Sequence, residues 1–282
     1  MAGFFGLFNY EKEGPGISKN APKKKTFIVF FETFFRNFWK FININLVYSI
    51  VSLPIVTNGL AAAGITNVTR NIARDKHSFG LSDFFETIKK NWKQALPVGI
   101  INALLYIILF YDVYFFNFAS EGTIAIIGLA VALSMTFIFT VMQFYIWTLM
   151  ITFDFKLKHL YKNSFKFVFI NMKMNLLCFF SIALIYAVNI AILFLFKSYF
   201  FPVLSIELFL YIILFPSFRY LLVQYCVFPS IKKHIIDPYY KEHPDEDIEK
   251  RRNLGIEIEK KNKPETQGED GGEEEPENVF ED

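Results

Sequence analysis

The longest uncharged stretch of the chain, residues 123–153, constrains the fold more than any other feature. Its sequence, TIAIIGLAVALSMTFIFTVMQFYIWTLMITF, contains no Asp, Glu, Lys or Arg. As a continuous α-helix it would be roughly 46 Å long, because such a helix rises about 1.5 Å per residue. The hydrocarbon core of a bilayer is about 30 Å thick, and a soluble protein of this size needs no apolar helix of that length. We therefore expect residues 123–153 to span a membrane.

Apolar residues elsewhere in the chain also fall in long blocks with few charges. Hydrophobic residues make up 53% of the 282 residues, and these blocks lack the short periodicity of a soluble domain. Lipid is therefore their expected surroundings. We predict an all-α fold, a polytopic membrane helical bundle with about five transmembrane helices. The blocks that would hold the spans are residues 41–69, 95–118, 123–153, 174–196 and 199–228.

The first block, residues 41–69, allows two shapes. It has no charged residue, but Pro54, Asn58, Gly59 and Gly64 interrupt it, so a single straight helix is not assured. Either residues 41–56 cross the membrane, or the block forms a broken, partly re-entrant hairpin whose freed backbone groups are buried by protein. We favour the first shape, and hence five spans, on length.

Two amphipathic segments accompany the first spans. Glu32, Arg36 and Lys40 recur every four residues, which places them on one helical face opposite phenylalanines and Trp39. This segment, residues 26–40, would lie in the membrane interface or form the first turns of the following span. In residues 70–94 an apolar stripe opposite lysines predicts a second interfacial helix.

The distribution of basic residues predicts the orientation. Lys and Arg gather in residues 70–94, 154–175 and 229–263, whereas the turns near residues 121 and 197 hold one basic residue between them. Because cytoplasmic loops carry an excess of Lys and Arg, we expect the basic segments and the C-terminus to be cytoplasmic. Five spans would place the N-terminal region outside despite its seven basic residues up to Lys40. A re-entrant first block would remove that conflict.

The chain is expected to have three parts. Residues 1–25 would form a flexible basic arm, and residues 26–240 the membrane helical domain. Residues 241–282 would form a polar, acidic and disordered tail, since the last nineteen residues carry nine carboxylates and no basic group.

Internal matches indicate a repeat of about eighty residues. A shift of eighty residues pairs Asn91 with Asn171, and a shift of eighty-one pairs Gln143 with Gln224. Each unit would be a basic cytoplasmic helix followed by a hairpin of two spans, which predicts parallel repeats about an axis along the membrane normal. Biased composition alone could also produce these matches.

The sequence offers no recognisable catalytic or ligand-binding motif. GxxxxGK, GxSxG, HExxH and CxxC patterns are missing, and the four histidines show no paired ligand spacing. Cys178 and Cys226 lie in apolar blocks, as expected for small hydrophobic residues. We therefore expect no enzyme activity, no cofactor, no bound metal and no nucleic-acid partner. An intramembrane hydrolase built from scattered residues is the enzymatic alternative.

Polar residues within the apolar blocks are the candidates for function, because an ionisable group at the centre of a membrane helix costs a few kcal/mol. Asp112 and Glu207 each lie several residues from an outer turn, so they could line a path for a cation or a sugar in one leaflet. Alternatively, Asp112 lies near the headgroups and Glu207 accepts hydrogen bonds from a neighbouring helix. Arg219 follows Glu207 by twelve residues, about 18 Å along a helix, so the two cannot pair. The predicted intramembrane polar path consists of Asp112, Glu207, Arg219 and Asn189.

Four short motifs carry a family resemblance. They are SLPIVTNG at residues 52–59, FxxTIKKNWKQA ending at Ala95, FYDVYFF starting at Phe110 and IIDPYY starting at Ile235. On these motifs the chain resembles the YesL-like family of bacterial integral membrane proteins, over about residues 27–240. Members of that family read closer to PIVTIGAS where this chain has Asn58 and Gly59.

The resemblance implies a location and a broad role. It implies a multi-pass protein of the bacterial plasma membrane, from a family with no established activity and no catalytic residues to transfer. The association of such proteins with carbohydrate uptake and breakdown implies an accessory or transporter-like component, with sugar-transport membrane proteins and the lipid bilayer as partners. The alternative is a membrane scaffold that recruits cytoplasmic partners through its basic amphipathic helices and acidic tail.

Overall fold

The computed structural model describes residues 26–243 of the chain. The chain divides into two compact units, Met1–Ile236 and Asp237–Asp282, and each is described here by itself. The expected basic arm, residues 1–25, and most of the expected acidic tail, residues 244–282, lie outside the described residues. The described part of the second unit consists mainly of one helix, α9, Asp237–Glu242.

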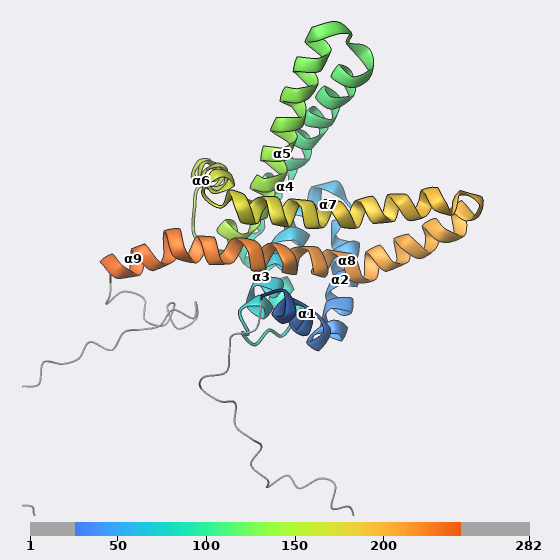
Figure 1. The fold of residues 1–282 in the computed structure, drawn as a ribbon. Helices are drawn as coiled ribbons and strands as arrows, with labels where there is room; N and C mark the ends of the chain where they lie inside the picture. Colours follow the sequence, from blue (N-terminus) through green and yellow to red (C-terminus); the bar gives the residue numbers. More distant parts are fainter. Residues whose placement is uncertain (1–25, 244–282) are drawn as a thin grey trace, which may run out of the picture. The chain divides into compact units, whose positions relative to one another are not determined.

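Every regular element among the described residues is a helix, which confirms the all-α fold class (Figure 1). Besides α9, these elements are α1 Thr26–Arg36, α2 Phe38–Ser52, the 3₁₀ helix η1 Ile55–Thr57, α3 Asn58–Ala73, α4 Leu81–Tyr114, the π-helix η2 Phe115–Ala119, α5 Gly122–Thr152, α6 Leu157–Ile170, α7 Met172–Leu195, the 3₁₀ helix η3 Lys197–Tyr199, α8 Phe200–Ile231 and the π-helix η4 Lys232–Ile236.

Four helices of the described chain, α4, α5, α7 and α8, are long and apolar enough to cross a membrane. The chain is therefore a helical membrane protein. The expectation of a fifth span at residues 41–56 is wrong, because α2 has only 15 residues and ends at Ser52. At about 1.5 Å per residue, α2 is roughly 22 Å long and falls short of the hydrocarbon core.

The first block forms the broken hairpin that was the alternative to a span. Pro54 adopts an extended conformation, with φ −75° and ψ 127°, so the helix cannot continue from α2 into α3. The turn η1 then leads into α3, which packs against α2, α4, α5 and α8. With four spans, the start and the end of the membrane domain lie on the same side, so the conflict over the basic N-terminal region disappears.

The basic segments that precede the two hairpins differ in how they join the span that follows. The segment at residues 81–94 is continuous with the span that follows, so α4 runs for 34 residues through Pro97. Proline removes the N–H that would bond to the carbonyl of Lys93, and because Lys93 is exposed, that carbonyl lies near the polar surface. By contrast, α6 is a separate helix that ends at Ile170, and Asn171 leads into α7.

The long helices form two hairpins, α4–α5 and α7–α8. Gly122, with φ +72°, makes the turn of the first hairpin, and the 3₁₀ turn starting at Lys197 makes that of the second. Figure 1 shows each hairpin extending away from the helices packed at its base. A basic amphipathic helical segment precedes each hairpin, which is the order of elements that the internal repeat predicts.

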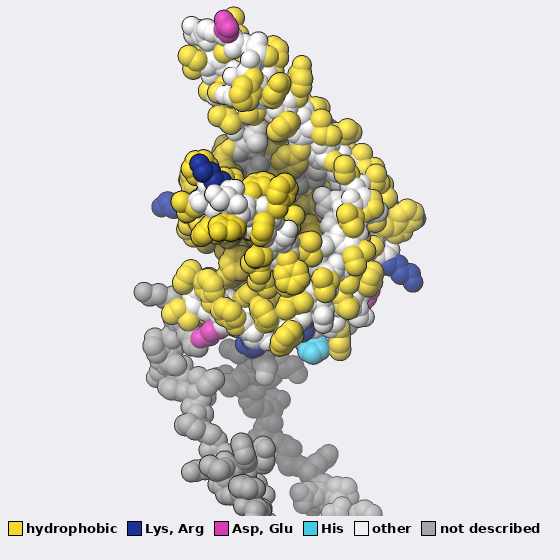
Figure 2. Space-filling view, turned by 90° about the vertical axis from the view of Figure 1, so that its right-hand side faces the viewer, with side chains coloured by type: hydrophobic (Ala, Val, Ile, Leu, Met, Phe, Trp, Pro, Cys, Tyr) yellow, Lys and Arg dark blue, Asp and Glu magenta, His cyan; other side chains and the backbone are white. Residues whose placement is uncertain are grey.

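Burial is confined to the base of each hairpin. All ten residues 141–150 of α5 are buried, whereas residues 200–215 of α8 include no buried residue. The last buried residues of α4 and α7 are Asn102 and Ile182, which are eighty residues apart, the offset of the internal repeat. The outer parts expose large apolar side chains such as Phe118 and Phe194, and Figure 2 shows one face covered largely by hydrophobic side chains. These outer parts suit contact with lipid.

The backbones of α3 and α4 approach closely at two glycines, Gly59 and Gly99. A Cβ placed on Gly59 would lie 2.3 Å from the carbonyl oxygen of Ala95 and 2.8 Å from the Cα of Gly99. Only glycine leaves room for the two backbones at this crossing. The crossing therefore fixes α3, the most buried helix, against the base of the first hairpin.

We predict that Gly59→Ala destabilises the protein, because its methyl group would overlap backbone atoms that cannot move aside alone. Overpacking of this kind costs about 1–3 kcal/mol, which corresponds to a fall in Tm of roughly 2–12 °C for a domain of this size. Thermal unfolding of the detergent-purified protein measures the change. Ser205→Ala, at an exposed position of α8, is the control and should shift Tm by less than about 1 °C. If the Gly59→Ala protein were as stable as this control, the close backbone contact between α3 and α4 would be contradicted.

Candidate functional site

The four residues of the expected polar path do not form one site. Glu207 and Asn189 line the same pocket, between α7 and α8. Arg219 lies lower in α8, among the buried residues at the base, and Asp112 lies near the tip of the other hairpin. Asp112 and Glu207 each lie toward the tip of a hairpin, but the two carboxylates belong to different hairpins (Figure 1).

The pocket at Glu207 has a volume of about 420 Å³ and a mostly apolar lining. Phe34 of α1 contributes to its wall, together with Tyr186 of α7 and Tyr211 of α8. The Oε1 atom of Glu207 is buried without a hydrogen-bond partner, and Asn189 uses its Nδ2 to donate to the carbonyl of Ile185, 2.7 Å away. The pocket can therefore receive an apolar group that offers a hydrogen-bond donor to Glu207.

Asp112 and Arg219 have few partners within the described residues. Asp112 forms no side-chain hydrogen bond or ion pair in that part of the chain, in keeping with a place near the headgroups at the hairpin tip. Arg219 contacts no carboxylate there, and its guanidinium carbon lies 5.1 Å from the centre of the Tyr220 ring. Its positive charge is therefore balanced by aromatic faces and not by an acidic side chain.

At the base of the bundle, hydrogen bonds between helices engage polar side chains that lie within apolar blocks of the sequence. The Oδ1 atom of Asn45 accepts from the hydroxyl and the backbone N–H of Ser217, at 2.6 and 2.8 Å, and its Nδ2 donates to the carbonyl of Ile213. The hydroxyl of Tyr145 donates to Asn175 at 2.7 Å. These bonds join α2 to α8 and α5 to α7.

A second polar chain runs from α6 to α5. The hydroxyl of Tyr161 donates to Oδ1 of Asn102 at 2.7 Å, and Nδ2 of Asn102 donates to Oε1 of Gln143 at 3.0 Å. On α8, Nε2 of Gln224 donates to the hydroxyl of Thr148 at 2.9 Å. The sequence could not give these partners, because a single sequence does not show which distant helices meet.

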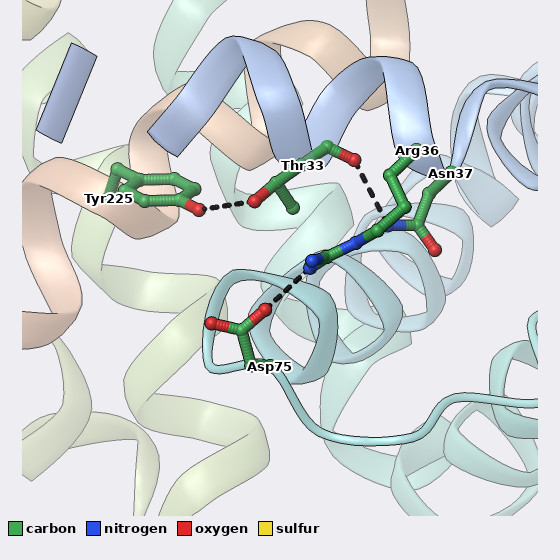
Figure 3. A network of polar contacts seen from close by, with 5 residues as sticks. All are labelled: Thr33, Arg36, Asn37, Asp75 and Tyr225. Carbon is green, nitrogen blue, oxygen red and sulfur yellow. Dashed lines mark hydrogen bonds and ion pairs between the residues drawn. The ribbon is translucent and has the colours of Figure 1, made fainter. Parts of the chain in front are cut away.

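A basic corner forms where α1, the loop after α3 and the start of α4 meet. Figure 3 shows Arg36 reaching toward Asp75, and the two side chains form an ion pair of 2.5 Å. Lys40 donates from Nζ to the carbonyl of Ser78, and Tyr225 of α8 donates to the hydroxyl of Thr33. A polar pocket of about 470 Å³ lies beside this ion pair. Both members of the pair are more than half exposed, so the pair adds little to stability.

Lys76, which lines this pocket, has a perturbed pKa. Burial, together with repulsion from Arg74 and Arg70, lowers the pKa of Lys76 to about 8. Burial also lowers the pKa of Arg70 and of Arg74 to about 10. Both arginines therefore stay charged at neutral pH, while Lys76 titrates close to it.

Metal binding finds no support in the described residues, which contain no group of three His, Cys, Asp or Glu side chains able to hold an ion. Cys178 and Cys226 are both buried free thiols, so the expectation that they pack as small residues agrees with the structure.

Comparison with known proteins gives one match. Residues 41–113 match a family model described as "Protein of unknown function, DUF624". The matched segment runs from the start of α2 to the outer end of α4, and so includes the broken hairpin and the Gly59–Gly99 crossing. No curated protein and no solved structure matches the chain. The chain is thus a membrane protein with a segment characteristic of a family of unknown function.

We predict that Lys76 reacts with an amine-acylating reagent at neutral pH well before the exposed Lys158 of α6 does. A pKa of about 8 leaves roughly a tenth of Lys76 neutral at pH 7, against less than about a thousandth for an ordinary lysine. The labelling rate of Lys76 should level off above about pH 8. Peptide mass spectrometry measures both rates.

Arg74→Gln should raise the pKa of Lys76 and shift its labelling midpoint to higher pH, because it removes the larger of the two repulsions. A wild-type Lys76 midpoint near the ordinary lysine pKa of about 10.4 would contradict the assigned surroundings.

Proposed function

We propose that this chain is an accessory, transporter-like component of a bacterial plasma membrane, linked to carbohydrate utilisation. Its C-terminus and basic segments would face the cytoplasm, in accord with the distribution of Lys and Arg. The family match at residues 41–113 supports the resemblance to YesL-like proteins, which belong to that family. The carbohydrate link comes from that resemblance.

The separation of the polar residues is the observation that carries the accessory role. A carrier that works alone needs a site between its repeats, lined by convergent polar groups. Here Glu207 and Asn189 line a lateral pocket of the second hairpin, while Asp112 belongs to the first. Such a pocket, with its apolar walls, favours a contact with a neighbouring membrane helix or a small apolar molecule over passage of a sugar.

The large exposed apolar surface of the outer hairpins fits the same role. Residues 103–114 of α4 and 200–215 of α8 contain no buried side chain, so each hairpin is free to pack against another membrane protein. Sugar-transport membrane proteins are the partners that we propose. We also propose that the chain catalyses no reaction, on the ground that its sequence lacks a recognised catalytic motif.

A membrane scaffold for cytoplasmic proteins is the second candidate. Its support is α6, which buries Leu160 and Val168 on one face and exposes Lys158, Lys162 and Lys166 on the other. Deletion of residues 264–282 would test whether the acidic tail recruits cytoplasmic proteins. Loss of co-purifying cytoplasmic proteins would favour the scaffold. An unchanged set of co-purifying proteins would count against a role of the tail in recruitment.

We expect affinity purification in a mild detergent to recover a sugar-transport permease with the tagged wild-type chain. Glu207→Gln should reduce this recovery severalfold if the buried carboxylate receives a donor from the partner, since a charged hydrogen bond is about twice as strong as a neutral one. Ser205→Ala, at an exposed position two residues away, is the matched control and should leave recovery unchanged.

Quantitative mass spectrometry, with an unrelated multi-pass protein as the reference bait, measures the enrichment. The accessory role would be contradicted if no membrane transport protein were enriched over that reference bait.

A further inference from the structure

The polar pocket of the basic corner is separate from the Glu207 pocket, and the proposed function makes no use of it. Its volume of about 470 Å³ is that of a small-molecule site. The end of α1, the start of α2 and the loop between α3 and α4 form its walls. Figure 3 shows two of the side chains at this corner, Arg36 and Asp75.

Basic side chains outnumber acidic ones in the pocket wall. Arg36, Lys40 and Lys76 line the pocket, and Asp75 is the only carboxylate among the described residues that line it. Because the charge of Asp75 is already paired with that of Arg36, the two lysines leave the pocket with a positive charge.

Contacts with the loop hold Lys40 in the pocket. Its Nζ atom donates to the carbonyl of Ser78 at 2.7 Å, and a Cβ placed on Gly80 would lie 3.2 Å from its Cγ atom. The stem of Lys40 therefore packs against a glycine that leaves room for it. An ammonium group has three N–H donors, so the bond to Ser78 leaves two of them for a ligand.

The loop that forms the facing wall has a fixed shape. Asp75 has φ +50°, which residues other than glycine rarely adopt, and the backbone N–H of Lys76 donates to the carbonyl of Asn71 at 2.9 Å. The hydroxyl of Ser78 donates to Asp83 at 2.7 Å, so this further carboxylate is engaged by the loop. A rare backbone conformation that its surroundings maintain is typical of binding sites.

Two arginines add positive charge close to Lys76. The hydrogen bonds of Arg70 go to neutral oxygen atoms, and the guanidinium of Arg74 lies 4.5 Å from the centre of the Phe228 ring. Both arginines repel the ammonium of Lys76, which contributes to its lowered pKa. An anion bound beside Lys76 would offset this repulsion.

Exposed aromatic residues adjoin the pocket residues in the sequence. Trp39 precedes Lys40 and is 77% exposed, and Phe79 follows Ser78 and is 74% exposed. Exposed aromatic side chains next to basic ones are typical of the interface between membrane and water, where the headgroups of phospholipids lie. The surroundings of the pocket therefore suit an anion that a lipid carries.

We propose that this pocket binds a phosphate group through Lys40, Lys76 and Arg36. A phosphate offers several anionic oxygen atoms, which can accept hydrogen bonds from the ammonium and guanidinium groups at the same time. An anionic phospholipid and a soluble phosphate ester share this chemistry, and the exposed aromatic residues favour the phospholipid. The bound phosphate would join the first two helices to the loop after α3.

Thermal unfolding of the detergent-purified wild-type protein tests the binding. Phosphatidylglycerol is compared with phosphatidylcholine of the same acyl chains, whose choline cation the basic wall repels. At a lipid concentration about tenfold above Kd, Tm should be roughly 3–6 °C higher with phosphatidylglycerol, and the rise should saturate.

Glycerol phosphate, compared with glycerol, tests the soluble source. A rise in Tm with phosphatidylglycerol alone would assign the phosphate to a lipid. A rise with glycerol phosphate would support the same site and show that it also accepts a soluble ester. If neither phosphate compound raised Tm over its reference, the proposal would be overturned.

Lys76→Gln separates the pocket from a general attraction of anions to basic surfaces. This variant should lose most of the response to phosphatidylglycerol, whereas Lys158→Gln, which removes an exposed lysine of α6, should keep it. In detergent alone, Lys76→Gln should shift Tm by less than about 2 °C, so that loss of the response does not reflect loss of the fold. Equal responses of the two variants would contradict the pocket.

Acylation of Lys76 gives a second reading of occupancy. The phosphate compound that raises Tm should slow the labelling of Lys76 at neutral pH severalfold, because a nearby negative charge raises the pKa of the amine and the ligand covers it. The labelling of Lys158 in the same sample corrects for general effects at the protein surface. An unchanged ratio of the two labelling rates would place the phosphate elsewhere and contradict the proposal.

Discussion

Lipid offers no hydrogen-bond partner to a backbone, and this constraint organises the whole described structure. Each outer hairpin is a pair of unbroken helices that satisfy their own backbone groups. The hydrogen bonds of Asn45, Asn102 and Gln143 lie at the packed base, whereas the irregular backbone around Pro54, residues 53–56, is exposed. Because only the base buries side chains, α3 and its glycine contact with α4 hold the two hairpins together.

The sequence predicted the outer features well and the contacts at the base poorly. The turns near residues 121 and 197, the basic helix at α6 and the long span at α5 follow from charge and apolar length alone. The prediction of a fifth span was wrong because it rested on the number of uncharged residues alone. Pro54 divides that block into two helices, each too short to cross the membrane. The positions of Glu207 and Asp112 toward the hairpin tips follow from their distance to the turns. Which helix each of them faces depends on long-range packing, which a single sequence does not contain.

The polar groups of the membrane domain fall into separate environments with separate chemistry. Glu207 offers an unpartnered carboxylate oxygen in an apolar pocket of the second hairpin, which suits a donor from a neighbouring molecule. Arg219 lies at the base in another environment, beside Gln143 and Gln224, whose Nε2 and Oε1 atoms respectively have no hydrogen-bond partner. A chain that divides its polar groups in this way is better suited to assisting another membrane protein than to carrying a solute across by itself.

We propose that both hairpins, whose helices are long and apolar enough to span a bilayer, cross the membrane from a common base, so that their tips share one side. Cysteine accessibility in intact cells tests it most directly, with Cys178 and Cys226 first replaced by alanine. A membrane-impermeant maleimide should label single cysteines placed at Ser120 and at Ser198, the two tips, and should not label one at Lys158 on α6 until the membrane is opened. Labelling of only one tip, or of Lys158→Cys together with the tips, would contradict the four-span account.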